Sequence, residues 1–345
     1  MNNPFTIIFG KNPNLSIERP IEKNEIIESF SNEPINQQIY LITSIRGSGK
    51  TVLMTEVSKY FKDKDNWIVI ELKPETDMQE NLLSKLNSQA GPLLKTLNFN
   101  LSLFNVFTIG ANLETKITDK ETAIIKILEH LKNQNKKVLI TVDEAVNNTN
   151  MKIFSSMFQI LVREELPVFL LMTGLYENIR NLQDEKSLTF LYRAPRINLG
   201  PLNLTSIESK YKMVFNISNE EAKTMARLTN GYAFAFQALG FLTFKHNNDY
   251  KAALSDYRMY LEEYSYNKIW SKLSKGDKKI LYGIVKSKTK NIKDILTSCN
   301  LDNNHFNPYR KRLIDKGILT NFERGTLRFV LPLFEEYILD NYFED

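Results

Sequence analysis

The stretch TSIRGSGKTVLM, residues 43–54, places two glycines beside one lysine and one threonine. Gly47 and Gly49 allow the backbone to curl so that successive N–H groups point into one concavity. Apolar residues follow at once with helical spacing, and the N-terminus of a helix attracts anions. The stretch therefore predicts a phosphate-binding loop (P-loop) for ATP or ADP. Its predicted nucleotide contacts are Arg46, Gly47, Ser48, Gly49, Lys50, Thr51 and Val52.

Two side chains of this loop have separate predicted roles. Lys50 would reach the β- and γ-phosphates, and the Thr51 hydroxyl would ligate Mg²⁺. The usual pattern G-x-x-x-x-G-K-[ST] has its first glycine where this chain has Ser44. Because serine is small and tolerates turns, we expect the loop to form, slightly tighter than usual. The competing interpretation is an ordinary glycine turn.

A second motif, VLITVDEA, is an apolar strand that ends in Asp143 and Glu144. This is the form of a Walker B segment, in which Asp143 would hold Mg²⁺ and Glu144 would polarise the attacking water. Thr173 ends the next apolar strand and is the candidate polar group that senses the γ-phosphate. The alternatives are a solvated acidic turn for the pair, and a helix cap or turn residue for Thr173.

Strands and helices alternate along the first 200 residues. Short aliphatic runs predict strands at residues 38–43, 67–72, 138–142, 167–174 and 196–202, with a hairpin or edge strand at residues 98–103. Amphipathic helical patterns lie between them, one of them directly before the strand at 138–142. The expected fold class is α/β, with a parallel sheet covered by helices.

The C-terminal part is expected to be different. Residues 204–270 have helical patterns throughout, and residues 271–331 predict three short helices followed by a hairpin, the outline of a winged helix. Asn307 would cap the third helix, with Pro308 at its first position and Gly317 just past its end. Residues 271–331 hold fourteen Lys and Arg against five Asp and Glu, which indicates an anionic partner.

Helical spacing places Tyr309, Leu313 and Ile314 on the buried side of that third helix. It turns Arg310 partly inward. Lys311 and Arg312 are predicted to point outward. The candidate contacts to double-stranded DNA are Lys311, Arg312, Arg324 and Arg328, the last two on the hairpin. Docking of a protein partner, or a purely structural role, also fits a winged helix.

The composition excludes several classes of protein. The chain has 345 residues, 42% hydrophobic residues and a net charge of +5, all ordinary for a globular protein. We expect no membrane span and no signal peptide. One cysteine, Cys299, cannot form an internal disulfide and fits a reducing cytoplasm. With three scattered histidines, a structural zinc site is not expected.

The motifs RGSGKT, ITVDEA and LLMTGL, with the later LTFLYRAPRINLGPL, resemble the AAA+ ATPases of the origin-recognition-like and STAND-like group. The opening PFTIIFGKNPNLSIERPIEKNEII is similar to the segment that passes beside the nucleotide base in that family, and Arg19 lies in it. The resemblance implies strand order 5-1-4-3-2, with Thr173 as sensor 1. It implies a nucleotide-binding core at residues 1–203, a helical lid at 204–270 and a winged helix at 271–345.

The resemblance also bears on two arginine positions, the arginine finger and the sensor 2 arginine. Arg193 and Arg196 are the candidates for an arginine finger that acts on the nucleotide of a neighbouring subunit, or they are plain surface residues beside a strand. Many AAA+ lids carry a sensor 2 arginine, but the matching stretch TNGYAFAFQALG has Ala233 and Phe234. This stretch is closer to the Gly-Gly-x-Pro lid of STAND-type switches.

The first hypothesis is a Mg²⁺-dependent ATP-binding ATPase whose nucleotide state alters self-association or DNA binding through the winged helix. The alternative is a nucleotide switch with negligible hydrolysis, whose winged helix docks a protein. A third hypothesis is a DNA-binding regulator that uses ATP only for stability.

Overall fold

The computed structural model describes residues 2–8, 13–94, 120–321, 323 and 325–343. The predicted hairpin or edge strand at residues 98–103 lies outside the described residues. The strands are β1 (Ile39–Thr43), β2 (Trp67–Leu72), β3 (Lys137–Val142), β4 (Val168–Gly174), β5 (Arg196–Asn198), β6 (Leu319–Asn321) and β7 (Leu327–Phe329). The first helices are α1 (Pro20–Ser31), α2 (Lys50–Lys62), α3 (Met78–Leu94), α4 (Lys120–Asn133), α5 (Thr149–Arg163), α6 (Tyr176–Gln183) and the 3₁₀ helix η3 (Lys186–Arg193).

The chain forms two compact units. One contains residues 21–42 and 54–197, and the other contains residues 1–20, 43–53 and 198–345. The later helices are α7 (Leu204–Phe215), α8 (Asn219–Leu228), α9 (Ala233–Lys245), α10 (Leu254–Leu261), the π-helix η4 (Glu262–Tyr266), α11 (Asn267–Ser271), α12 (Lys275–Lys286), α13 (Ile292–Cys299), α14 (Asn303–Asp315) and α15 (Phe334–Asn341).

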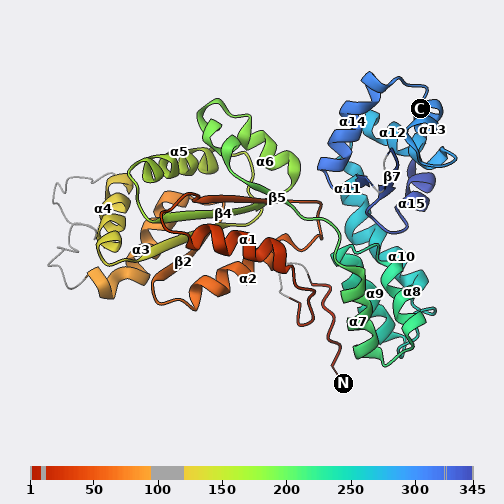
Figure 1. The fold of residues 1–345 in the computed structure, drawn as a ribbon, viewed down its shortest axis with the longest axis horizontal. Coiled ribbons are helices and arrows are strands. Elements are labelled where there is room, and N and C mark those ends of the chain that lie inside the picture. The colour runs from red at the N-terminus through yellow and green to blue at the C-terminus, as the bar shows by residue number, and fades with distance from the viewer. Residues whose placement is uncertain (1, 9–12, 95–119, 322, 324, 344–345) are drawn as a thin grey trace, which may run out of the picture. The chain divides into compact units, whose positions relative to one another are not determined.

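Five strands form one sheet in the order β2-β3-β4-β1-β5 (Figure 1). Strands β2, β3 and β4 pair in parallel, with Ile70 opposite Ile140 and Ile140 opposite Leu170. Every residue of β1 and β4 is buried, as expected for strands covered on both faces. The predicted α/β class and the predicted strand order, counted from the opposite edge, are therefore confirmed. The fifth strand is shorter than predicted and spans Arg196–Asn198.

Side chains that alternate along the strands contact different helices, because a strand has a period of two residues. Aromatic rings from α1 and α2 cover one face: Phe30 lies 5.2 Å from Phe169, and Phe61 lies 4.2 Å from Trp67, between ring centroids. Helices α3, α4 and α5 cover the other face and pack on residues such as Ile140. Figure 1 shows α1 and α5 on opposite sides of the sheet.

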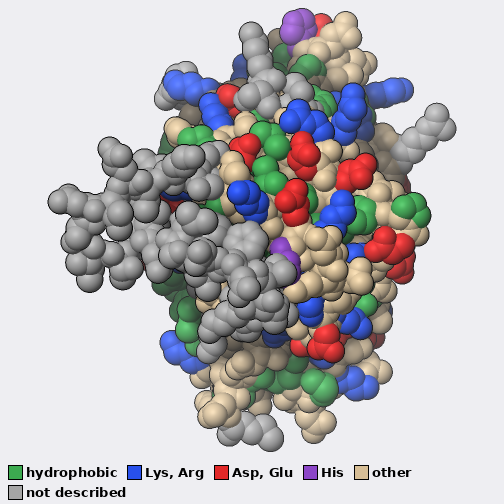
Figure 2. Space-filling model, turned by 90° about the vertical axis from the view of Figure 1, so that its left-hand side faces the viewer, with side chains coloured by type: hydrophobic (Ala, Val, Ile, Leu, Met, Phe, Trp, Pro, Cys, Tyr) green, Lys and Arg blue, Asp and Glu red, His purple; other side chains and the backbone are tan. Residues whose placement is uncertain are grey.

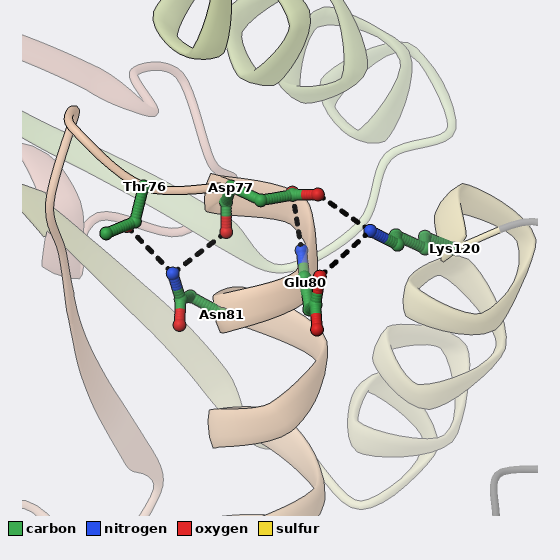
Figure 3. Close-up of polar contacts among 5 residues, drawn as sticks. All are labelled: Thr76, Asp77, Glu80, Asn81 and Lys120. Atoms are coloured by element: carbon green, nitrogen blue, oxygen red, sulfur yellow. Dashed lines mark hydrogen bonds and ion pairs between the residues drawn. The ribbon is translucent and has the colours of Figure 1, made fainter. Parts of the chain in front are cut away.

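The N-terminal ends of α3 and α4 are joined by a polar cluster (Figure 3). Lys120 Nζ lies 2.7 Å from Asp77 Oδ2 and 3.2 Å from Glu80 Oε2. Hydrogen bonds from the Glu80 backbone and from Lys120 lower the pKa of Asp77. These side chains are 40–50% exposed, so the cluster aligns the two helices but contributes little stability.

In the other unit, helices α7 to α11 follow one another through the predicted helical region. The N-terminal segment packs on α9: the Phe5 ring lies so close to Gly240 that a Cβ there would be 2.3 Å away. The side chain of Gln237 fixes the same segment, because its Oε1 accepts from Thr6 N and its Nε2 donates to Leu15 O. Residues far apart in sequence are thus joined around one helix.

The basic C-terminal segment forms α12, α13 and α14, followed by the antiparallel pair β6–β7. This is the element order predicted for a winged helix, and α15 follows as a helix that was not predicted. The prediction that Asn307 caps the third helix is wrong. Helix α14 begins one turn earlier, where Asp302 accepts a hydrogen bond from His305 N at 2.9 Å, and Pro308 lies inside the helix. Gly317 does follow the C-terminus of α14, with φ +77°.

Within the described ranges, no helix combines the length and the apolar character that crossing a membrane requires.

Candidate nucleotide-binding site

The P-loop has the predicted curl. Gly47 and Gly49 adopt φ +74° and +92°, a region that side-chain-bearing residues rarely occupy. Helix α2 begins at Lys50, directly after the second glycine. Lys50 Nζ donates to the carbonyls of Ser44 and Ile45 at 3.2 and 2.8 Å, so its charge lies over the loop. The loop therefore gathers N–H groups, a helix N-terminus and an ammonium group in one place.

Ser48 adds a specific sign of a polar ligand. Its residue is only 5% exposed, and its hydroxyl oxygen has no hydrogen-bond partner within the part of the chain that the structure describes. A buried hydroxyl without a partner costs free energy, so such groups mark places where a ligand or water completes the bonding. A phosphate oxygen is a suitable acceptor for this hydroxyl.

Ser44 explains why the departure from the usual first glycine is tolerated. Its side chain is buried, and its Oγ donates to Leu199 O at 2.8 Å. The serine thus attaches the start of the loop to the segment after β5. A glycine would leave this bond unmade.

Helix α9 begins against the loop. The Tyr232 hydroxyl donates to Arg46 O at 2.7 Å, and Phe234 N donates to Gly47 O at 3.0 Å. Both residues lie in the stretch TNGYAFAFQALG, which matches the position of a sensor 2 arginine in many AAA+ lids, and the role of Tyr232 was not predicted. The available signal was a tyrosine in an otherwise apolar run, since a buried tyrosine hydroxyl requires a polar partner.

Arg19 also contacts the loop. Its guanidinium donates to Ser48 O at 3.3 Å and to Gly200 O at 2.7 Å, and the residue is 9% exposed. Arg19 therefore supports the loop backbone. It lies in the N-terminal segment for which the resemblance implies a place beside the nucleotide base. Of the other predicted loop residues, Thr51 and Val52 lie half-buried in the first turn of α2.

The Walker B segment is built at the ends of β3 and β4. The Thr173 hydroxyl donates to Asp143 Oδ1, and Glu144 N donates to Thr173 Oγ1 at 3.2 Å. Thr173 is fully buried, Asp143 is half-buried and Glu144 is exposed. Glu144 has φ +53°, an uncommon conformation for a residue with a side chain and one that is often found at functional sites. Thr173 thus orients the acidic pair and does not cap a helix.

The two arginine-finger candidates are exposed. Arg193 ends η3, and Arg196 begins β5 with its guanidinium 5.1 Å from the centroid of the Tyr176 ring. Stacking on an aromatic ring leaves the donors at the edge of the guanidinium available for other contacts.

One candidate DNA contact is placed differently from the prediction. Arg312 does not point outward: its Nε and Nη2 donate to Asp277 Oδ1 at 2.9 and 2.6 Å, and Asp277 is buried. The helical periodicity gave the wrong direction because a buried carboxylate on α12 attracts the guanidinium across the helix pair. Lys311 and Arg328 are exposed as predicted, and Arg324 lies outside the described residues.

Comparison with known proteins supports the fold. Residues 263–338 match the family model "Domain of unknown function (DUF8462)", and no curated protein matches the sequence. The Walker-type ATPase PABY2304 of Pyrococcus abyssi is similar in structure, with a TM-score of 0.63, 16% identity, and 94% of this chain and 96% of that chain covered. The Aeropyrum pernix ORC2 protein, described as ADPNP-ADP complexes, has a TM-score of 0.57, 14% identity, and 97% and 96% covered.

At these identities the likeness establishes the fold. It covers nearly the whole of each chain, and it agrees with the strand order and with the glycine loop that precedes α2. The chain has the P-loop AAA+ fold, and its resemblance to origin-recognition-like ATPases is confirmed at the level of the fold.

Proposed function

We propose that this chain binds ATP with Mg²⁺ and hydrolyses it, and that the bound nucleotide acts on a winged helix that binds DNA. The observation that carries the nucleotide proposal is the P-loop: two glycines at positive φ, the buried hydroxyl of Ser48 and the start of α2 at Lys50. The proposal includes domain boundaries after residues 203 and 270.

The loop residues would bind the triphosphate. Backbone N–H groups of residues 46–52 and the Ser48 hydroxyl would donate to phosphate oxygens. The Lys50 ammonium would exchange its two carbonyl partners for the β- and γ-phosphates, which are stronger acceptors. Arg19 would hold the loop backbone beside the base.

The donor set also fits Mg²⁺, which prefers hydroxyl and carboxylate oxygens and retains water. Thr51 and Asp143 would hold the ion, and Thr173 would keep the Asp143 carboxylate in place. The ion would neutralise charge on the phosphates during transfer. Glu144 would accept the proton of the attacking water, with its carboxylate directed by the left-handed backbone at that residue. Arg193 and Arg196 would serve the nucleotide of a second copy.

Calorimetry with ATP or ADP and Mg²⁺ tests the nucleotide proposal. Wild-type protein should bind both nucleotides, Lys50→Ala should bind at least about a hundredfold more weakly, and Lys59→Ala on the exposed side of α2 should bind normally. Absence of binding by the wild type, or normal binding by Lys50→Ala, would contradict the proposal.

A switch with negligible hydrolysis is the second candidate, and one observation favours it. The lid presents Tyr232, Ala233 and Phe234 where many AAA+ proteins have a sensor 2 arginine, and Tyr232 and Phe234 donate hydrogen bonds to the loop backbone. Multiple-turnover phosphate release, measured with and without DNA, separates the two candidates. Release of several phosphates per protein supports the ATPase, and less than one supports the switch.

The DNA proposal rests on exposed charge. Arg312 is held by Asp277. The exposed basic side chains of the winged helix include Lys311, Arg328 and a row on α12 formed by Lys275, Lys279 and Lys286. The three α12 lysines lie within about 40° of one another around the helix axis at 100° per residue. This row of like charges differs from the face shown in Figure 2, where basic and acidic side chains are mixed.

Anisotropy of a labelled DNA duplex tests this surface. Replacing Lys275, Lys279 and Lys286 by Gln should weaken binding and reduce the slope of log K against log salt by about 0.9 for each lost phosphate contact. The matched control replaces Lys59, Lys62 and Lys132, which are also exposed, and should bind as the wild type does. Equal binding by both variants, and by Lys311→Ala, would reject the DNA proposal in favour of protein docking.

A further inference from the structure

The Tyr232 hydroxyl lies between the P-loop and the helices that lead to the winged helix. It donates to Arg46 O at 2.7 Å and lies 2.7 Å from Ser265 Oγ. A tyrosine hydroxyl has one proton, and a carbonyl can only accept, so Ser265 must donate its own proton to Tyr232. Burial raises the pKa of Tyr232, so the hydroxyl stays protonated at neutral pH and keeps this direction. The two bonds therefore form an ordered chain from Ser265 to the loop.

The contact leaves little freedom for the loop. Tyr232 is 2% exposed, and a Cβ added at Gly47 would lie 2.5 Å from its hydroxyl. The next bond along, from Phe234 N to Gly47 O, holds the adjacent peptide. A change in the Arg46–Gly47 backbone must therefore move Tyr232 or break its hydrogen bond.

Ser265 continues the chain toward the C-terminal domain. It belongs to the π-helix η4, a rare type of helix turn that is frequently found at functional sites. The adjacent Tyr266 is fully buried, and its hydroxyl donates to Pro332 O, just before α15. The Tyr266 ring packs at 5.0 Å from Phe334 and 5.6 Å from Tyr337, both on α15. Of these two neighbours in η4, Ser265 thus contacts the P-loop side through Tyr232, and Tyr266 contacts the winged-helix side.

We propose that Tyr232 is the positioning residue through which the nucleotide state of the P-loop reaches the winged helix, by way of Ser265 and Tyr266. This inference rests on the proposed nucleotide binding and names its route. Nucleotide binding alters the loop carbonyls, Tyr232 follows them, and η4 transmits the shift to Pro332 and α15.

Trp270 provides the readout. It lies in α11, directly after η4, and packs at 6.0 Å from Tyr337 and 6.5 Å from Phe334. The other tryptophan, Trp67, is removed by Trp67→Phe, so emission then comes from Trp270 alone. In this background, saturating ATP or ADP with Mg²⁺ should change the Trp270 emission, and calorimetry on the same samples reports binding separately.

The variants separate positioning from binding. Tyr232→Phe should bind nucleotide about fivefold more weakly, the effect of one lost hydrogen bond, and should lose more than half of the Trp270 response at saturation. Ser265→Ala should bind almost normally and lose the response to the same extent. The matched control is Tyr257→Phe, which removes a buried hydroxyl of the lid that donates to Leu228 O and should keep the response.

The outcomes are distinguishable. No heat of nucleotide binding by the wild type overturns the proposed function. Binding without any Trp270 response, or a full response in both Tyr232→Phe and Ser265→Ala, overturns this inference and leaves nucleotide binding intact. An equal loss of response in Tyr257→Phe also overturns it, because the effect would then reflect general loosening of the lid.

Discussion

The guanidinium of Arg312 donates two hydrogen bonds to one carboxylate oxygen of Asp277, at 2.9 and 2.6 Å. Asp277 also receives the Ser274 hydroxyl at 2.9 Å, and Lys316 Nζ lies 3.6 Å from its Oδ2. These contacts join α12 to α14 through a charge that is almost fully buried. A buried carboxylate needs such partners, so Arg312 stabilises the packing of α12 against α14.

Asp277→Asn should destabilise the packing of α12 against α14 in a pH-dependent way. Burial raises the pKa of Asp277, but Arg312, Ser274 and Lys316 more than offset burial, and the net pKa is lowered. A lowered pKa in the folded state stabilises the protein above the unfolded value of about 3.9, and this stabilisation is lost as the pH falls through the folded value. We expect a loss of about 3 kcal/mol at pH 7 that shrinks below about pH 4.

Urea unfolding followed by Trp270 emission in the Trp67→Phe background measures this difference. Asp302→Asn is the control, because Asp302 is exposed and caps α14 without contacting Arg312. A constant difference between wild type and Asp277→Asn from pH 3 to pH 7 would show that the ion pair is not the cause.

Glu144→Gln should retain ATP and lose turnover. Glutamine preserves the size of the side chain and the left-handed backbone but cannot accept a proton from water. The expected loss of kcat is at least about a hundredfold, with an ATP affinity close to that of the wild type. Single-turnover phosphate release measures it, and equal hydrolysis by the variant would rule out Glu144 as the base.

Gly47→Ala should disrupt the loop far more than Gly200→Ala. At Gly47, φ is +74° and an added Cβ would lie 2.5 Å from the Tyr232 hydroxyl, whereas nothing lies within 4 Å of a Cβ at Gly200. We expect nucleotide affinity to fall at least tenfold in the first variant, roughly 1.4 kcal/mol, and to stay unchanged in the second. Calorimetry decides, and comparable affinities for both variants would mean that the loop can readjust.

Thr173→Val should raise the Mg²⁺ concentration needed for ATP hydrolysis. Valine fills the same space, but the hydroxyl that donates to Asp143 is lost. Removal of a group that orients a metal ligand typically costs 10- to 100-fold in metal affinity, and we expect about 10-fold here because the Asp143 ligand itself is only half-buried. Titration of turnover with Mg²⁺ measures the shift. If the Mg²⁺ dependence stays the same while kcat falls, Thr173 acts on the phosphate and not through Asp143.

The sequence alone was sufficient for the features that depend on neighbouring residues. The glycines at 47 and 49 predict a curled loop because few other residues accept positive φ, and both adopt it. Aliphatic runs alternating with helical patterns predict a parallel sheet covered by helices. A continuous aliphatic strand has apolar side chains on both faces, and both faces must be buried. The cap of α14 was predicted wrongly, since Asp302 and Asn307 are both suitable cap residues and local preference does not choose between them.

The tertiary structure decided which polar groups meet. Tyr232 and Arg46 are 186 residues apart, and Arg312 and Asp277 are 35 residues apart. Helical periodicity tells which side of a helix is buried. It does not tell that the neighbouring helix carries a carboxylate for Arg312, or that a loop carbonyl lies opposite Tyr232. A hydrogen bond forms only when two groups come within about 3 Å with the correct orientation. Only the packing of distant segments sets that distance, so these pairings could not be read from local pattern.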